Sequence, residues 1–433
     1  MNQGPKSVFS TSTRLKKCVF TAALFYSTFT LGMCSTFLNS AILTFSRRLN
    51  TNIEHVSKVF IVILVSYICS ALSCGVIFRF VSRQKCVVLL LSLMSLALFS
   101  IPHATTLTTL FLASSLIGLG GGGYDTAQMA WIIDIWRNES PPFILSQNFV
   151  YSLGTLIPPI LLAPYLRTGP EASIDGEMLQ TSLDVPFTIA GCLVVLAVVI
   201  HLTLIWVCKG SKPSEVDNNN DILRALLAEE TPEEAQFTVR KIYFVVLACC
   251  ITGFYCGLEQ ITSQFLPTFS HFSPVALTEA EGARVLFGLQ VGFSVGRLLG
   301  IGLVLKVPPS FLLTGNLALL FIANMILMNF AGTSIAWLWA GSILFGLGMS
   351  TVYPSTYAYV SKHVFVTDGV AAIISVSGGI VSSIYPVIVG RSVETNPAIV
   401  TYVNFVSITV CTLAFATLVW TTRRERLSNY IRL

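Results

Sequence analysis

The chain has 433 residues, of which 54% are hydrophobic and only 11% are charged, and its formal net charge is +5. Soluble globular domains carry about 25% charged residues, so this composition excludes an ordinary soluble domain and indicates a protein that spans a membrane many times. The positive charge gathers between the apolar segments, and we interpret it as a topology signal rather than as a surface for nucleic acid.

Apolar segments long enough to cross a bilayer follow one another along the whole chain, since about 20 residues suffice for one spanning helix. We predict an all-α membrane protein with twelve transmembrane helices in two bundles of six. The predicted spans are 18–44, 57–81, 86–102, 106–136, 141–166, 186–208, 241–270, 282–306, 309–331, 333–360, 366–389 and 397–421. They delimit an N-tail (1–17), a first bundle (18–208), a linker (209–240), a second bundle (241–421) and a C-tail (422–433).

The 26 Lys and Arg residues favour alternate connecting segments, including both tails. Such an excess is typical of cytoplasmic loops, so we expect both termini in the cytoplasm and the protein in the cell membrane. The first apolar segment is too long for a signal-peptide core, and we interpret it as a retained span.

In the first predicted span, polar residues recur at helical spacing, because Thr28, Ser35 and Asn39 lie on one face. Similar stripes of amides and hydroxyls occur in spans 4, 7 and 8. They suit a neutral sugar, whose hydroxyls donate and accept hydrogen bonds, although for any single Ser, Thr or Asn hydrogen bonding between helices is the more ordinary explanation. The candidate sugar-binding residues are Asn39, Gln128, Asn148, Gln264, Gln290 and Tyr353.

The fourth predicted span contains four consecutive glycines followed by Tyr124 and Asp125. Small residues let a second helix approach closely. A carboxylate inside an apolar span usually faces a water-filled path or a cation, and the first half offers Asp125 no obvious basic partner. We therefore predict that Asp125 binds a coupling cation. The spacing Gly118-x-Gly120-x-x-Gly123 also matches the dinucleotide fingerprint, but that motif must follow a strand and open a helix, so we reject a nucleotide site.

Two more ionisable residues, Glu259 and Arg297, lie within consecutive spans of the second half. A charge at a helix centre costs about 2.5–3.5 kcal/mol, so each could neutralise the other in a structural ion pair. The alternative for Glu259 is a second role in cation coupling.

The two halves repeat one pattern. Gly118-Leu119-Gly120 and Pro158 recur as Gly346-Leu347-Gly348 and Pro386 at one common offset. Six spans repeated once in parallel place a substrate near the midplane, between the halves. The eleven cysteines form no CxxC spacing, and no nucleophile–base pair stands out, so we expect neither an enzyme nor a metal site or bound cofactor.

At these residues the chain resembles the branch of the major facilitator superfamily that contains the sodium-dependent glucose transporters and major facilitator domain-containing protein 4. The resemblance covers nearly all twelve spans. It rests on Leu49–Glu54, Gly118–Thr126, Ile135-Trp136 leading into Pro142, Tyr255-x-Gly257-x-Glu259, Gly296–Ile301 and Gly346–Pro354. It implies the major facilitator fold and a cation-coupled hexose carrier, with fucose-type sugar symporters as more distant relatives.

The chain departs from this family at three places. Arg79 replaces the Asp of the loop after span 2, which puts the gating salt bridges of that loop in question. Met129 replaces an Asn that follows the span-4 Asp by four residues. Asn148 stands where a His is common early in span 5, so it keeps hydrogen bonding but cannot titrate.

We expect a secondary transporter that moves a neutral hexose such as glucose with an inward sodium gradient, by alternating access. Sodium would be a co-substrate, the partners would be the sugar and the lipid bilayer, and the protein would be a monomer. Proton coupling, facilitated diffusion and a non-transporting sensor or receptor on a transporter fold remain alternatives.

Overall fold

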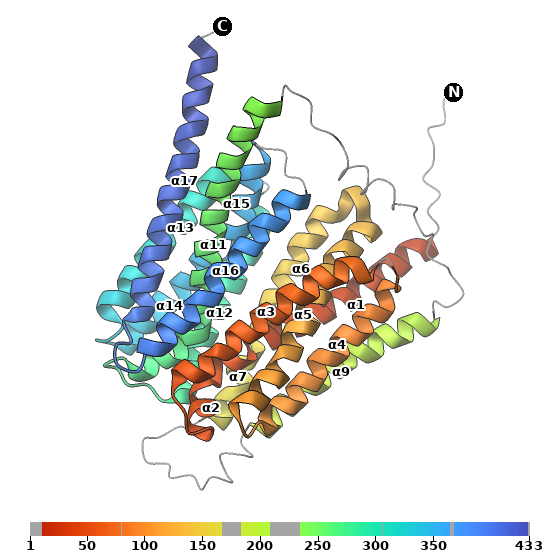
Figure 1. Ribbon diagram of the computed structural model, residues 1–433, viewed down its shortest axis with the longest axis vertical. Helices are drawn as coiled ribbons and strands as arrows, with labels where there is room; N and C mark the ends of the chain where they lie inside the picture. Colours follow the sequence, from red (N-terminus) through yellow and green to blue (C-terminus); the bar gives the residue numbers. More distant parts are fainter. Residues whose placement is uncertain are drawn as a thin grey trace.

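The computed structural model describes residues 11–431 apart from 79, 167–182, 208–233, 305 and 364–367. Its helices form two bundles that stand beside one another (Figure 1). The first contains α1 (Thr11–Thr36), η1 (Phe37–Ser40), α2 (Ile42–Arg48), α3 (Ile53–Ile77), α4 (Arg83–Ser100), η2 (Ile101–His103), α5 (Leu107–Trp136), η3 (Arg137–Glu139), α6 (Ser140–Thr155), α7 (Ile157–Leu162), η4 (Ala163–Tyr165) and α9 (Asp184–Val207). The second contains α11 (Glu234–Phe272), α12 (Glu279–Val304), α13 (Pro309–Phe330), α14 (Ile335–Met349), α15 (Val352–Ser361), α16 (Asp368–Ser392) and α17 (Ile399–Ile431).

Ten helical segments of the described part of the chain are long and apolar enough to cross a membrane. The two other predicted spans fall on α16 and on the broken segment α6–α7–η4. The break follows from Pro158 and Pro159, which have no N–H to donate to the preceding turn. The all-α, membrane-spanning architecture predicted from the sequence is confirmed.

Three helices extend beyond the predicted boundaries, and the first of them, α1, begins at Thr11, inside the predicted N-tail 1–17. α11 begins at Glu234, inside the predicted linker 209–240, and α17 continues through the predicted C-tail to Ile431. Apolar composition marks the part of a helix that lies in lipid, whereas the helix itself extends further. Arg79 and residues 209–233 of the predicted linker lie outside the described residues.

Glycines let helices within each bundle touch backbone to backbone. A Cβ atom on Gly118 of α5 would overlap the carbonyl oxygen of Ile63 on α3. In the second bundle, a Cβ on Gly346 of α14 would overlap the carbonyl oxygen of Leu289 on α12. The repeated glycines thus occupy equivalent helix pairs in the two halves, and they make each bundle a tightly packed unit.

The bundles meet at the end of the molecule opposite the chain termini, which we call the closed end. It comprises η1, α2 and the beginning of α3 from the first bundle, with the end of α11, the beginning of α12 and the end of α16 from the second. The helix axes diverge from there toward the end that carries both termini, which we call the terminal end (Figure 1). Between the two ends, α3 contacts α16 and α6 contacts α12.

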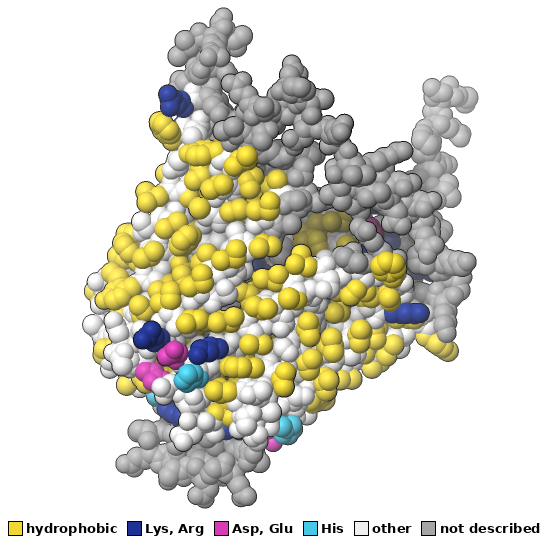
Figure 2. Space-filling view, in the orientation of Figure 1, with side chains coloured by type: hydrophobic (Ala, Val, Ile, Leu, Met, Phe, Trp, Pro, Cys, Tyr) yellow, Lys and Arg dark blue, Asp and Glu magenta, His cyan; other side chains and the backbone are white. Residues whose placement is uncertain are grey.

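Hydrophobic side chains cover the flanks of both bundles, and several charged side chains gather at the closed end (Figure 2). Phe311 on α13, for example, is 72% exposed. Such a surface is expected for helices that face lipid, because hydrocarbon chains replace the water that a soluble protein would meet.

Candidate substrate cavity and cation site

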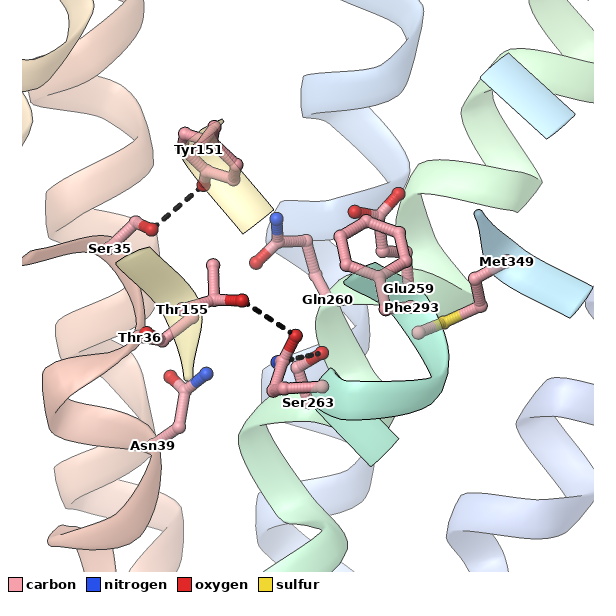
Figure 3. A pocket seen from close by; sticks show the side chains of 11 residues that line it. Ser35, Thr36, Asn39, Tyr151, Thr155, Glu259, Gln260, Ser263, Phe293 and Met349 are labelled. Atoms are coloured by element: carbon pink, nitrogen blue, oxygen red, sulfur yellow. Dashed lines mark hydrogen bonds between the residues drawn. The ribbon is translucent and has the colours of Figure 1, made fainter. Parts of the chain in front are cut away.

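A polar cavity lies between the two bundles, and the space inside its wall, open solvent included, is about 350 Å³. Both halves contribute to its wall, as the repeated architecture predicts (Figure 3). Its lining consists of Ser35, Thr36, Asn39, Tyr151, Thr155, Glu259, Gln260, Ser263, Gln290, Phe293 and Met349.

Hydrogen bonds tie the cavity wall together across the bundle interface. The hydroxyl of Thr155, at the end of α6, donates to Oε1 of Gln290 on α12 at 2.9 Å. The amide of Gln290 reaches the Ser263 hydroxyl at 3.5 Å (Figure 3). Gln290 therefore links the two bundles at the level of the cavity.

One acceptor in the wall has no protein partner in the described structure. Asn39, at the end of the first span, is 2% exposed, and its Oδ1 atom makes no hydrogen bond. A buried carbonyl oxygen without a donor is costly, so such groups usually find a water or a ligand.

The other predicted sugar-binding residues lie outside this lining. Gln264 is 6% exposed and donates to Gln260 at 3.3 Å. Asn148 is exposed on α6, and Tyr353 packs its ring 5.1 Å from that of Tyr357. Gln128 is buried beside Asp125. Of the six predicted contacts, Asn39 and Gln290 line the cavity in this conformation.

Several residues of the cavity wall were not predicted from the sequence. Tyr151 and Thr155 are one turn apart on α6, and this spacing just before the proline break was the available signal. The Ser35 and Tyr151 hydroxyl oxygens lie 2.8 Å apart, which joins α1 to α6. Phe293 and Met349 carry no pattern that distinguishes them from other apolar residues of a spanning helix.

Glu259 lines the cavity, but it does not form the predicted direct ion pair with Arg297. Among the described residues, the ion pairs within 4.0 Å are Arg47–Glu279 and Arg83–Asp134.

The Arg297 side chain instead connects α12 to α6. Its Nη1 donates to the Asn148 carbonyl oxygen at 2.7 Å, and its guanidinium carbon lies 4.1 Å from the centre of the Phe293 ring. The side chain therefore stacks on its own helix and turns toward the first bundle, and this direction leaves Glu259 accessible from the cavity.

Three helices surround Asp125. The Tyr67 hydroxyl of α3 donates to Oδ2 and the Gln128 amide donates to Oδ1, each at 2.6 Å. Thr28 of α1 donates to the Gln128 oxygen at 2.5 Å. Gly122 permits this arrangement, because a Cβ there would overlap the Tyr67 carbonyl oxygen and push α3 away. The half-buried carboxylate is thus held by neutral donors, and the described residues offer it no basic partner.

Two six-helix bundles around a shared polar cavity define a membrane carrier. Residues 24–386 match the sequence profile of the Major Facilitator Superfamily, and the chain belongs to this family. It is accordingly a multi-pass membrane transporter and not an enzyme.

Known relatives are distant. The chain is 23% identical over 416 residues to sodium-dependent glucose transporter 1 of Danio rerio, covering 90% of this chain and 66% of that protein. It is 22% identical over 375 residues to sodium-dependent glucose transporter 1A of Mus musculus (83% and 86% covered). It is also 22% identical over 428 residues to major facilitator superfamily domain-containing protein 4A of Xenopus tropicalis (85% and 84% covered).

Two solved structures share the fold. The nucleoside transporter NupG (D323A mutant) aligns with a TM-score of 0.65 at 13% identity, covering 92% of this chain and 98% of that one. The transporter FucP in its outward conformation aligns with a TM-score of 0.60 at 14% identity, covering 93% and 99%. These likenesses confirm the predicted major facilitator fold.

Proposed function

We propose that the protein is a secondary active transporter that moves a neutral hexose, glucose or a close analogue, together with sodium across the cell membrane. The observation that carries this proposal is the cavity between the bundles, whose wall consists mainly of amides and hydroxyls from both halves. Relatives named sodium-dependent glucose transporters support the same substrate and ion.

The chemistry of the wall favours a neutral polyol. Each sugar hydroxyl both donates and accepts, and Asn39, Gln260 and Gln290 offer both kinds of group. The rings of Tyr151 and Phe293 supply apolar surface for the C–H faces of a sugar. The lining contains one carboxylate and no Lys or Arg, so it has no counter-charge for an anionic substrate.

In a mechanism of alternating access, the contacts at the closed end would control entry to the cavity from one side of the membrane. With both termini in the cytoplasm, as the distribution of Lys and Arg favours, the closed end faces outward and this conformation is inward-facing. Substrate from outside then reaches the cavity only after the contacts at the closed end separate. Rocking of the two bundles against one another around the central site is the expected motion.

Asp125 and Glu259 are the proposed cation-coupling residues. Glu259 lies in the cavity wall, beside the sugar, whereas Asp125 lies among α1, α3 and α5. In this conformation the Tyr67 and Gln128 donors stabilise the Asp125 carboxylate.

Uptake of labelled glucose into proteoliposomes tests the function, with sodium, pH and voltage varied separately. We expect saturable uptake that a sodium gradient drives above equilibrium. Accumulation driven by a pH gradient would identify a proton symporter, and equilibration without accumulation a facilitative carrier. Saturable binding without uptake would identify a sensor. Competition by uridine but by no hexose would overturn the proposed substrate.

A further inference from the structure

The Thr28 hydroxyl lies between two acceptors although it has one proton. Its Oγ1 is 2.8 Å from the Leu24 carbonyl oxygen and 2.5 Å from Oε1 of Gln128. The same Gln128 amide donates to Asp125 at 2.6 Å on its other side. In this arrangement the Thr28 proton cannot serve both acceptors fully.

A half-turn of the Gln128 amide resolves this competition, because an amide presents either its oxygen or its NH₂ to a neighbour. The NH₂ would then donate to Thr28, and Thr28 would donate to Leu24. The cost arises at the other side, where the Gln128 oxygen would face Oδ1 of Asp125 across the present 2.6 Å contact. Two acceptors at that distance repel one another unless a proton joins them or a cation binds both.

We propose that Gln128 is a ligand of the coupling cation, and that its amide turns when the cation binds Asp125. This inference rests on the proposed function, and it reassigns Gln128 from the sugar to the cation. Gln128 is 3% exposed and does not line the cavity. With the amide turned, the Gln128 oxygen would lie beside Oδ1 of Asp125, whose Oδ2 contacts the Tyr67 hydroxyl, and oxygen atoms are the donors that hard cations prefer.

The turn of the amide also reaches the sugar cavity. Thr28 is on α1, and Ser35 of the cavity wall lies seven residues further along the same face of that helix. In this conformation Thr28 is shared between its own helix and Gln128, whereas with the amide turned it accepts from Gln128 and donates to Leu24. Cation binding thereby changes the hydrogen bonds between α1 and α5. Because α1 also contributes Ser35 to the wall of the sugar cavity, this change couples the cation site to the sugar site.

Sodium binding to the purified protein tests this proposal without sugar. Thermal unfolding is followed while sodium chloride replaces choline chloride, because a ligand of the native state raises the unfolding temperature as its concentration exceeds Kd. Gln128→Met should raise the half-maximal sodium concentration about tenfold or more, as the loss of groups around a bound metal ion typically does. Gln128→Glu keeps an oxygen ligand and should retain sodium stabilisation. Gln147→Met replaces another buried amide, on α6, and should match the wild type.

Transport kinetics distinguish the two roles of Gln128. A cation ligand predicts that Gln128→Met raises the half-saturating sodium concentration while the KM for glucose at saturating sodium stays within twofold. A raised glucose KM with unchanged sodium dependence would overturn the proposal. So would equal loss of sodium stabilisation in the Met and Glu variants. If sodium fails to stabilise the wild type while glucose uptake persists, the cation site is wrong and the sugar carrier stands.

Discussion

Arg47 on α2 and Glu279 on α12 form an ion pair across the two bundles at the closed end. Glu279 is 5% exposed and also accepts from the Thr44 hydroxyl at 2.6 Å. Arg47 extends the contact to Nε2 of His271, 3.3 Å away at the end of α11. A first-bundle arginine is thereby fastened to two helices of the second bundle, so separation of the closed end must break this cluster.

We predict that Glu279→Gln opens the closed end more often. Hydrogen bonds to charged groups contribute about 1.5–3 kcal/mol, so the open population should rise about tenfold or more. Leu43 lines a small cavity there with Asn39 and Glu279, and a Leu43→Cys substitution reports access by a membrane-impermeant maleimide. The Glu279→Gln variant should be labelled faster than its parent. Glu281→Gln, an exposed carboxylate on the same helix, serves as control, and equal labelling of all three proteins would contradict the prediction.

A second prediction concerns Gly390 of α16, which contacts α3 of the other bundle at this end. A Cβ there would lie 2.7 Å from the Ser57 hydroxyl oxygen and 3.0 Å from its Cβ, both on α3. Gly390→Val should therefore act as a wedge that slows closure, raise maleimide access and lower the transport rate at normal abundance. A Cβ atom added at Gly315 on α13 would have no neighbouring atom within 4 Å. Gly315→Val should therefore leave the maleimide access and the transport rate unchanged. A Gly390→Val protein that cycles normally would show that this contact does not hold the closed end.

Asp125→Asn should abolish accumulation driven by the ion gradient while part of the sugar exchange between the two sides remains. The variant removes the negative charge but keeps an oxygen that accepts from Tyr67. Counterflow of labelled glucose and gradient-driven uptake, measured on the same proteoliposomes, separate the two activities. Accumulation at the wild-type level, with normal surface abundance, would refute a coupling role for this residue.

Glu259 and Arg297 should act independently in folding. Because the two side chains form no direct ion pair in this conformation, Glu259→Gln should retain abundance and lose transport. Arg297→Met should lower abundance through loss of its bond to the Asn148 carbonyl oxygen. Expressed as a free energy of unfolding, the loss in the double variant should equal the sum of the losses in the two single variants, within about 0.5 kcal/mol. Recovery of abundance in the double variant would establish the structural pair that the sequence predicts.

We predict that substitutions in the cavity wall lower the affinity for sugar more than substitutions outside the wall do. Asn39→Ala and Gln290→Ala should each raise the KM for glucose about three- to tenfold, the effect of losing one hydrogen bond of about 0.5–1.5 kcal/mol. Asn148 and Tyr353 lie outside the wall, so Asn148→Ala and Tyr353→Phe should change the KM for glucose less than twofold. The reverse order would show that the sugar binds elsewhere, or in a conformation with a different wall.

The sequence predicted those features that a single helix determines by itself. Apolar length predicted the spans, and the glycine run predicted the close approach that the Gly118 contact with α3 shows. Helical spacing placed Asn39 on a polar face that does line the cavity. The depth of Glu259 and Arg297 was also readable from the chain, but the direction of each side chain around its helix was not.

The remainder of the site depends on how separate helices pack. Gln128 belongs to a polar face like that of Asn39, yet its neighbours across the helix interface make it a partner of Asp125. Tyr151 and Phe293 enter the wall because α6 and α12 approach one another, and the spacing of residues within either segment does not show that approach. The break before α7 was foreseeable from its two prolines, whereas the predicted span ran through it.

The glycine contacts within the bundles have a consequence for natural variation. At Gly118, Gly122 and Gly346 even a methyl group meets a backbone carbonyl, and a backbone cannot move aside as a side chain does. Substitutions there should destabilise one half before any question of ion or sugar arises, and cellular quality control removes such chains. Inherited changes at these glycines should therefore resemble an absent carrier, whereas variants with altered selectivity should map to the surfaces that the bundles share.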